Sequence, residues 1–143
     1  MRTLAWVLLA AAGAVAGLSG FTFVYGKGYS YLLDDPVVCT NCHVMRDNFD
    51  LWAAASHRTV TCNQCHTPHG LRKYAAELRN GVVHSAVFTL RDVPVLRIKP
   101  YNQEILQGNC ESCHRPMIDA IQPPGGPRAR YCFDCHPGVG HGW

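Results

Sequence analysis

The sequence predicts a mainly α-helical protein, with one amino-terminal transmembrane helix (residues 1–26) followed by a small domain of short helices and loops (residues 27–143) and no significant sheet. Three observations lead to this fold class. A long apolar segment opens the chain, and its eight cysteines form four like pairs. A length of 143 residues suits one domain and leaves no room for a second sizeable hydrophobic core.

The amino-terminal segment is long enough to cross a membrane. Leu4 to Tyr25 is a run of 22 residues without a charge, flanked by Arg2 and Lys27. At about 1.5 Å per residue, a helix of this length spans a hydrocarbon layer of roughly 30 Å. A cleaved signal peptide is the alternative, but its apolar region is normally ~7–15 residues. A buried core helix would need a polar face, which this segment lacks, so we predict an uncleaved anchor.

The eight cysteines form four pairs, and a histidine directly follows each pair. The pattern C-x-x-C-H attaches c-type haem: the two thiols form thioethers, and the adjacent histidine is placed to reach the iron. The sequence therefore predicts four covalently bound haems, attached through Cys39 and Cys42, Cys62 and Cys65, Cys110 and Cys113, and Cys132 and Cys135.

Two other uses of paired cysteines are weaker explanations. Structural zinc also binds paired C-x-x-C units, but zinc gives no reason for a histidine after all four pairs. A disulfide within C-x-x-C closes a very small loop, so four of them would constrain little of the chain. The sequence therefore favours a haem protein, in which four macrocycles supply much of the apolar interior.

Local patterns predict the elements that surround the haems. The stretch Asn48–Ser56, with its apolar and aromatic side chains, predicts a helix. Leu71–Arg79 predicts another, which ends near Asn80-Gly81 because glycine commonly follows the last helical turn. The run Pro123-Pro124-Gly125-Gly126-Pro127 predicts a loop.

The attachment chemistry also predicts the side of the membrane on which the domain lies. Covalent haem attachment takes place outside the cytoplasm, so the amino terminus is expected inside and the domain after Tyr25 outside. Arg2 favours this orientation, whereas Lys27 opposes it. The formal net charge is +3, but the basic residues are scattered and form no run that tracks a phosphate backbone. We therefore expect no nucleic-acid partner.

Four histidines remain outside the motifs as candidates for the second axial position of the irons. His57 and His141 are the best placed, because His57 ends the predicted helix and His141 lies in a tail that can fold back. His69 follows His66 too closely to turn easily onto the same iron, so a hydrogen-bonding role is expected. His84 has no assignment on local grounds. Met45 follows the first motif, and ordinary packing beside a haem explains it on these grounds.

The chain resembles the NapC/NirT family of membrane-anchored quinol dehydrogenases, and within it the small tetrahaem subunits of cytochrome c nitrite reductase complexes. The resemblance covers nearly the whole chain: one anchor, four motifs and a short tail with a histidine. Its specific marks are Cys-Thr-Asn-Cys-His-Val-Met at residues 39–45, Cys-His-Thr-Pro-His at 65–69, Asn-Gly-Val-Val-His-Ser-Ala-Val-Phe-Thr at 80–89, and Asn-Cys at 109–110.

The resemblance implies a set of axial ligands. Met45 would ligate haem 1 in place of His43, which leaves the other face of this haem open or weakly occupied near the quinol site. The same comparison pairs His66 with His141 on haem 2 and His114 with His57 on haem 3. His136 would hold haem 4, whose remaining position a lysine of the partner fills.

The resemblance also implies a function. The protein would sit in the bacterial inner membrane with its haems facing the periplasm, oxidise menaquinol, and pass the electrons to cytochrome c nitrite reductase. The quinol site needs proton acceptors, and its candidates are Lys73, Glu77, His84 and Asp92. His84 takes the place where the family has an acidic residue.

Three other functions fit the same motifs. The chain could be a passive anchored electron carrier that another protein reduces, or a quinol dehydrogenase that serves a different periplasmic reductase. A haem-based sensor is the third, but no signalling domain is visible in the sequence.

Overall fold

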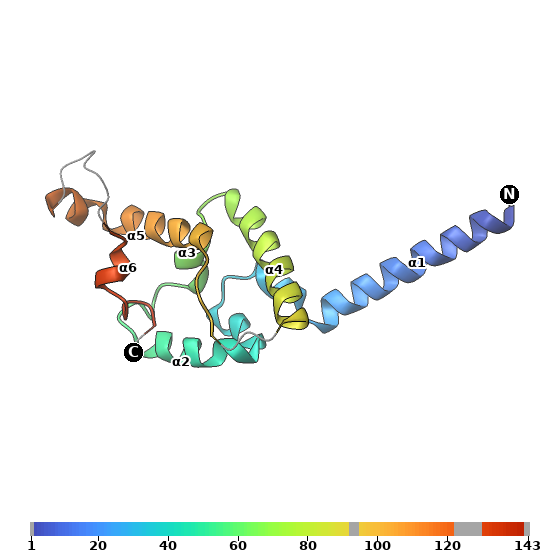
Figure 1. The fold of residues 1–143 in the computed structure, drawn as a ribbon, viewed down its shortest axis with the longest axis horizontal. Helices are drawn as coiled ribbons and strands as arrows, with labels where there is room; N and C mark the ends of the chain where they lie inside the picture. Colours follow the sequence, from blue (N-terminus) through green and yellow to red (C-terminus); the bar gives the residue numbers. More distant parts are fainter. Residues whose placement is uncertain (1, 92–94, 122–129, 142–143) are drawn as a thin grey trace.

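The computed structural model describes residues 2–91, 95–121 and 130–141. These ranges contain helices and turns and no strand, so the predicted mainly α-helical class is confirmed. One helix, α1 (Arg2–Tyr25), projects away from a small domain formed by the remaining elements (Figure 1). The domain contains three short 3-10 helices and five α-helices, which are η1 (Gly28–Leu32), η2 (Pro36–Asn41), η3 (His43–Met45), α2 (Arg46–Ala54), α3 (Cys62–His66), α4 (Arg72–Leu90), α5 (Pro100–Ile121) and α6 (Cys132–Cys135).

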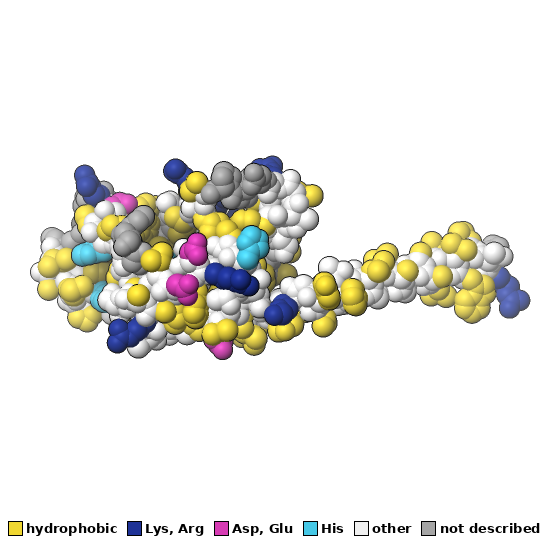
Figure 2. Space-filling view, turned by 90° about the horizontal axis from the view of Figure 1, so that it is seen from below, with side chains coloured by type: hydrophobic (Ala, Val, Ile, Leu, Met, Phe, Trp, Pro, Cys, Tyr) yellow, Lys and Arg dark blue, Asp and Glu magenta, His cyan; other side chains and the backbone are white. Residues whose placement is uncertain are grey.

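The helix α1 is the one candidate membrane span among the described residues. It has 24 residues, a mean hydropathy of 2.0 in its most apolar stretch, and no buried residue. Figure 2 shows hydrophobic side chains along its length and charged side chains only toward its two ends. At about 1.5 Å per residue the helix is long enough for a bilayer core.

The chain turns sharply where α1 ends. Lys27 adopts left-handed backbone angles, with φ of 52°, and the Gly26 amide donates a 2.8 Å hydrogen bond to the Thr22 carbonyl. A left-handed residue just after the last turn is a common way to end a helix. The turn leads directly into η1, which packs against both α1 and α4.

The helix α2 lies close to its predicted position. It runs from Arg46 to Ala54, two residues earlier at each end than the predicted Asn48–Ser56. The Trp52 indole donates hydrogen bonds to the carbonyls of His57 and Val60, at 3.2 and 2.9 Å. These bonds fix the loop that carries His57 against the helix.

The predicted end of the next helix is wrong. Instead of ending near Asn80-Gly81, α4 continues to Leu90. At Gly81 the helix passes close to the ring of Tyr31, and an added Cβ would lie 3.3 Å from that ring. Glycine is present here because η1 approaches the helix closely, a tertiary requirement that a local pattern does not reveal.

The third motif lies inside a long helix that the sequence did not predict. Pro100 occupies the first turn of α5, where its missing N–H costs little, and the helix runs through Cys110 and Cys113 to Ile121. Both α4 and α5 are longer than the short helices expected. The predicted loop at residues 123–127 falls outside the described residues.

The described residues form almost no hydrophobic core of their own. Ala55 and Ala76 are the buried apolar residues among them, at 7% and 2% exposure. Three polar residues are buried as well: Thr67, Glu77 and Gln107. A domain of this size needs more buried apolar surface than two alanines provide. The polypeptide alone therefore does not account for the stability of the domain.

Candidate haem sites

The four cysteine pairs form a line that follows their order in the sequence. The side chains of Cys39 and Cys62 lie close enough to interact, which places the first motif beside the second. The thiol of Cys65 lies close enough to that of Cys113 for their charges to interact, and the thiol of Cys110 does so with that of Cys132. Each attachment site therefore neighbours the next one along the chain.

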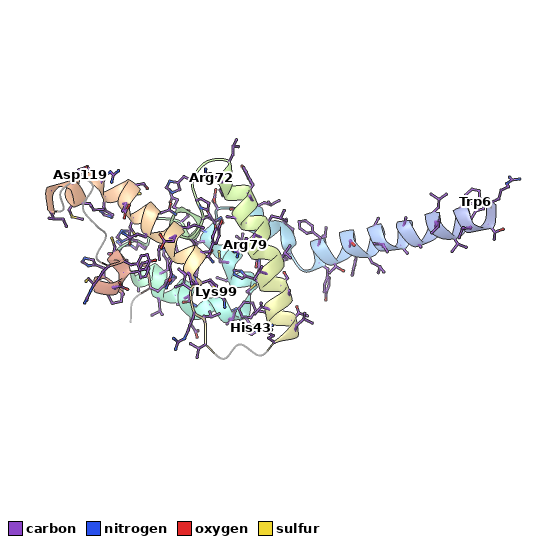
Figure 3. All side chains as sticks on the ribbon, turned by 45° about the horizontal axis from the view of Figure 1, so that its top comes forward. Trp6, His43, Arg72, Arg79, Lys99 and Asp119 are labelled. Carbon is purple, nitrogen blue, oxygen red and sulfur yellow. The ribbon has the colours of Figure 1, made fainter. Side chains whose placement is uncertain are left out.

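The line begins at the end of α1. The Lys27 ammonium donates a 3.0 Å hydrogen bond to the Asn41 side chain, inside the first motif. The Asn41 amide in turn donates to the Ser30 hydroxyl at 2.7 Å. These two bonds hold the first attachment site against the turn that follows the membrane helix. In Figure 3, His43 of this motif lies on the side of the domain that carries the end of α4.

Buried amide side chains connect the remaining motifs. The Asn109 amide, next to Cys110, donates to the carbonyls of Cys65 and Thr67 at 2.9 and 2.8 Å. Gln107, only 3% exposed, accepts a 2.8 Å bond from the Cys132 amide. The second, third and fourth motifs are thus joined through α5, and α6 with the fourth motif lies far from α1 (Figure 1).

Two pairs of histidines face each other across gaps that fit one iron each. The ring centroids of His66 and His141 are 6.0 Å apart, and those of His57 and His114 are 5.9 Å apart. A metal–imidazole bond is about 2 Å long, so two imidazoles on opposite sides of one metal have centroids roughly 6 Å apart. The residues present therefore fit haem iron at these two places.

Hydrogen bonds orient the outer imidazole of each pair. The Nδ1 of His141 lies 3.0 Å from the Asn48 carbonyl oxygen, which can only accept, so this nitrogen donates and leaves Nε2 free to bind a metal. The Nδ1 of His57 lies 3.1 Å from the Ser56 hydroxyl, which in turn donates to the Val139 carbonyl at 3.3 Å. The carboxyl-terminal tail is thereby held against the end of α2.

Burial keeps the second-motif histidine neutral. His66 is half-buried in the domain, and this burial, with a smaller effect from the neighbouring His141, lowers the pKa of His66 to about 4. Neutral imidazole is the form that binds a metal. His69 differs, because its Nε2 lies 3.2 Å from the Gln64 carbonyl oxygen and donates to it. That bond agrees with the hydrogen-bonding role expected for His69.

The other predicted ligands lie at separate places. His43 and Met45 bound the 3-10 helix η3, where His43 is exposed and Met45 is half-buried. His136 directly follows α6 and is exposed at the far end of the domain from α1. The structure does not bring a second histidine ring against either His43 or His136 among the described residues.

A polar cluster joins the start of α4 to the loops around the first two motifs. The Lys73 ammonium donates to the Asp34 carboxylate at 2.5 and 2.6 Å and lies 3.6 Å from Glu77. The Asn63 amide, inside the second motif, donates to Asp34 at 2.9 Å and to Glu77 at 3.2 Å. Two of the predicted quinol-site residues, Lys73 and Glu77, therefore lie together.

The cluster contains one carboxylate that is almost completely enclosed. Glu77 is 2% exposed, and its Oε2 has no hydrogen-bond partner. Burial raises the pKa of Glu77, although the Lys73 charge opposes the effect. The hydrogen bond with Lys73 lowers the pKa of the exposed Asp34, and the same bond raises that of Lys73. Glu77 is thus the member of the cluster most ready to take up a proton.

His84 lies two turns further along α4, beside Tyr31. The Tyr31 hydroxyl is 3.4 Å from His84 Nδ1, and the ring of Phe88 stands at the other side of the imidazole, 6.2 Å between centroids. Burial lowers the pKa of His84. Burial and the neighbouring Cys42 and Cys39 raise the pKa of Tyr31 to about 12, so its hydroxyl stays protonated.

Sequence reasoning missed three residues of this region. Asp34, Asn63 and Tyr31 contact the predicted candidates from elements distant in the sequence, with separations of 39, 14 and 53 residues. No local pattern links such positions. Asp92, also a predicted proton acceptor, lies outside the described residues.

A family comparison agrees with this arrangement of motifs. The model of the NapC/NirT cytochrome c family, N-terminal region, matches residues 1–92, well over half of the chain. The chain belongs to the NapC/NirT cytochrome c family. Membership confirms the resemblance inferred from the motifs. It also means that the protein binds haem covalently, because this is a family of c-type cytochromes. Together with the one candidate span α1, it makes this member a single-pass membrane protein.

Two curated proteins are similar to this NapC/NirT member over most of their length. One is the cytochrome c-type protein NrfH of Wolinella succinogenes, 35% identical, with the match covering 84% of this chain and 78% of the relative. The other is the cytochrome c nitrite reductase subunit NrfH of Nitratidesulfovibrio vulgaris, 27% identical, covering 90% and 80%.

A solved structure shares the fold. The crystal structure of the cytochrome c nitrite reductase NrfHA complex bound to the HQNO inhibitor superposes with a TM-score of 0.65 at 26% identity, covering 94% of this chain and 90% of that one. The superposition includes both the membrane helix and the domain of this NapC/NirT member, because so little of either chain is left out.

Proposed function

We propose that this protein is a membrane-anchored tetrahaem quinol dehydrogenase that oxidises menaquinol and delivers the electrons to a periplasmic cytochrome c nitrite reductase. One observation carries the proposal: the line of four attachment sites begins at the end of the membrane helix, where Asn41 is bonded to Lys27 and Ser30, and ends at the far side of the domain. Such a line connects a lipid-dissolved donor with a soluble acceptor. The NrfH relatives and the NrfHA complex support this pairing of donor and acceptor.

The proposed axial ligands follow from the facing imidazoles and from family membership. His66 and His141 would hold the second iron, and His114 and His57 the third, because each pair has a centroid separation suited to one metal. Met45 would hold the first iron in place of His43. His136 would hold the fourth, and a lysine of the reductase would complete its coordination at this exposed end of the domain.

When bound, each haem accepts one electron at a time. A quinol that loses two electrons must therefore pass them to two haems, or to one haem that is reoxidised between the two steps. Its two protons must go to the polypeptide. His84 is a neutral imidazole whose Nδ1 lies beside the Tyr31 hydroxyl, and in the tautomer in which Nδ1–H donates to that hydroxyl oxygen, Nε2 accepts one proton. The buried Glu77 carboxylate accepts the other, since its raised pKa favours the protonated form.

The remaining members of the cluster position these acceptors. Lys73 stays charged because it is paired with Asp34, and it lies 3.6 Å from Glu77. Asn63 donates to both carboxylates and holds α4 against the second motif. Asp34 is exposed, so the cluster that holds Glu77 borders the water on the side of the domain. The proposed orientation therefore places the domain, and the released protons, on the periplasmic side.

A visible absorption spectrum tests the proposal. The purified, detergent-solubilised protein is mixed anaerobically with a menaquinol analogue, and the reduced c-type haem bands are followed over time. Rapid appearance of these bands supports direct quinol oxidation. Full reduction by dithionite but none by the quinol would instead favour a passive electron carrier. Electron delivery is then measured as nitrite-dependent reoxidation after a cytochrome c nitrite reductase is added.

A further inference from the structure

The outer face of α4 carries a row of large apolar side chains that no element of the described chain covers. Leu71, Tyr74, Leu78 and Val82 recur at intervals of three and four residues, so they lie on one side of the helix. Their exposures are 88%, 57%, 69% and 63%. The opposite side faces the domain, where Ala76 and Glu77 are each 2% exposed.

The row lies at the end of the domain where the membrane helix begins. The 3-10 helix η1 directly follows α1 and packs on α4, and its own apolar side chains Tyr29 and Leu32 are also exposed. A soluble surface rarely presents this many large apolar side chains on one exposed helix side, and such groups mark a binding partner. The neighbouring partner at this end of the molecule is the bilayer that α1 crosses.

The direction of α4 suits a position on the membrane surface. Figure 1 shows α4 running across the axis of α1 instead of along it. Because a spanning helix crosses the bilayer, a helix that lies across it at the end of the span runs within the plane of the interface. An interfacial helix buries its apolar side ~5–10 Å into the boundary between headgroups and acyl chains.

The charges on α4 complete the match to a lipid surface. The helix contains three basic residues and one acidic residue, which are Arg72, Lys73, Arg79 and Glu77. Arg79 points toward α5, with its guanidinium 4.5 Å above the Tyr101 ring, so it flanks the apolar row (Figure 3). Lys73 and Glu77 belong to the cluster with Asp34, so the positive charge outside that cluster is that of Arg72 and Arg79. Basic residues on an interfacial helix favour anionic phospholipid headgroups.

We propose that α4 is an interfacial helix, with Leu71, Tyr74, Leu78 and Val82 seated in the outer leaflet of the membrane. This inference deepens the proposed function and rests on its membrane anchor. Glu77 and His84 lie on the same helix, so an α4 seated in the interface would hold the proposed quinol site at the membrane surface. The depth of α4 in the leaflet would then set the height of the quinol site.

Photolabelling of the intact, haem-loaded chain tests the position of α4. The protein is reconstituted into phosphatidylcholine–phosphatidylglycerol vesicles that contain a phospholipid with a photoreactive group in its acyl chain, and labelled peptides are identified by mass spectrometry. Lipid adducts on residues 71–82 as well as on α1 are the expected result. Adducts on α1 alone, or α4-to-α4 crosslinks between two copies without lipid adducts on α4, would overturn the proposal.

A pair of variants supplies the control. Leu78→Glu places a charge in the apolar row, whereas Met117→Glu places one at an exposed position of α5 remote from this row. We expect Leu78→Glu to reduce the adduct yield on α4 several-fold with the α1 yield unchanged, and Met117→Glu to leave both unchanged. Equal yields in all three proteins would contradict the proposal. Labelling requires no quinol oxidation, so an inactive protein with a labelled α4 would count against the proposed function alone.

Discussion

Individual histidine rings carry the most specific information in this structure. The facing pairs His66–His141 and His57–His114 join residues that are 75 and 57 positions apart in the chain. Each ring pair leaves room for one metal, and the Asn48 carbonyl orients the His141 ring. In the structure, His57 and His141, the two best-placed candidates from the sequence, each face one motif histidine.

Removing the outer member of either pair should change the spin state of one haem. We expect His141→Ala and His57→Ala each to convert one six-coordinate low-spin haem to a high-spin form, because one axial nitrogen is lost. Electron paramagnetic resonance of the oxidised protein measures the change. His69→Ala is the matched control, since its Nε2 bonds the Gln64 carbonyl. A low-spin spectrum that survives in His141→Ala would contradict the pairing with His66.

Met45 is tested in the same way against a second methionine. We expect Met45→Ala to shift the spectrum of haem 1 and to slow menaquinol oxidation, because a thioether ligand raises the potential of the iron. Met117→Ala should have no effect, since Met117 is 58% exposed on α5. Optical redox titration of both variants provides the measurement. An unchanged spectrum in Met45→Ala would leave His43 as the ligand.

Glu77 should affect both stability and quinol oxidation. Burial raises its pKa in the folded protein, so folding is favoured while the carboxyl is protonated, and this contribution is lost as the pH rises through the folded-state pKa. Glu77→Gln should therefore gain stability relative to the parent as the pH rises. Denaturant unfolding at a series of pH values, followed in the Soret band, measures this. The same variant should slow quinol oxidation by ~10²-fold, the lower end of the range for a lost proton acceptor.

Asp34 provides a control of opposite sign. Its pKa is lowered by Lys73, so its contribution to stability is present above the ordinary carboxyl pKa and is lost as the pH falls through the lowered value. Asp34→Asn should therefore lose stability relative to the parent at neutral pH, and the difference should shrink in acid. Parallel pH profiles for Asp34→Asn and Glu77→Gln would show that the cluster does not work as described.

At the scale of single elements, tertiary contacts overrode a local signal. Asn80-Gly81 is typical of a helix end, yet α4 continues for another nine residues because Gly81 lies against Tyr31. The anchor and α2 were predicted to within two residues, since hydrophobic length and aromatic content are local properties. The sequence of α5 is interrupted by a haem motif and by Pro116, which hid its helical pattern.

Because η1 lies close to α4 at Gly81, a larger side chain should destabilise the domain more at residue 81 than on the outer side of the helix. Gly81→Leu should destabilise the domain by about 1–3 kcal/mol, because the new side chain displaces the Tyr31 ring. Ala75→Leu adds similar volume on the exposed outer side of α4 and should change stability by less than about 0.5 kcal/mol. Denaturant unfolding of both variants makes the comparison. Equal losses would mean that the Tyr31 contact does not limit the size of residue 81.

At the scale of the whole molecule, the sequence says more about haem attachment than about the residues that surround the haems. The C-x-x-C-H motifs identify the attachment residues because the chemistry is encoded within five consecutive positions. The proton-accepting cluster is assembled from α4, the second motif and the loop that contains Asp34, so only part of it was foreseen. Chemistry carried by adjacent residues is readable from a sequence, whereas chemistry assembled by folding is not.

The small polypeptide core leads to a prediction for the protein without its cofactors. Among the described residues, only Ala55 and Ala76 are buried apolar residues. A chain in which all eight cysteines are replaced by alanine should therefore show no cooperative thermal unfolding and little protection of its amides from hydrogen exchange. Haem content of the parent, measured as the pyridine haemochrome, should be four per chain. A cooperative transition in the haem-free chain would show that the polypeptide folds alone.

The order of the attachment sites has a consequence for how the protein is made. In the proposed orientation the amino terminus stays inside and the chain after the anchor is exported in sequence order, so the first motif emerges beside the anchor and each later motif meets a neighbour that is already outside. Asn63, Asn109 and Gln107 then bond elements that arrive one after another. The haems can therefore be attached one after another, beginning at the membrane. This order of attachment is the same as the proposed order of electron transfer.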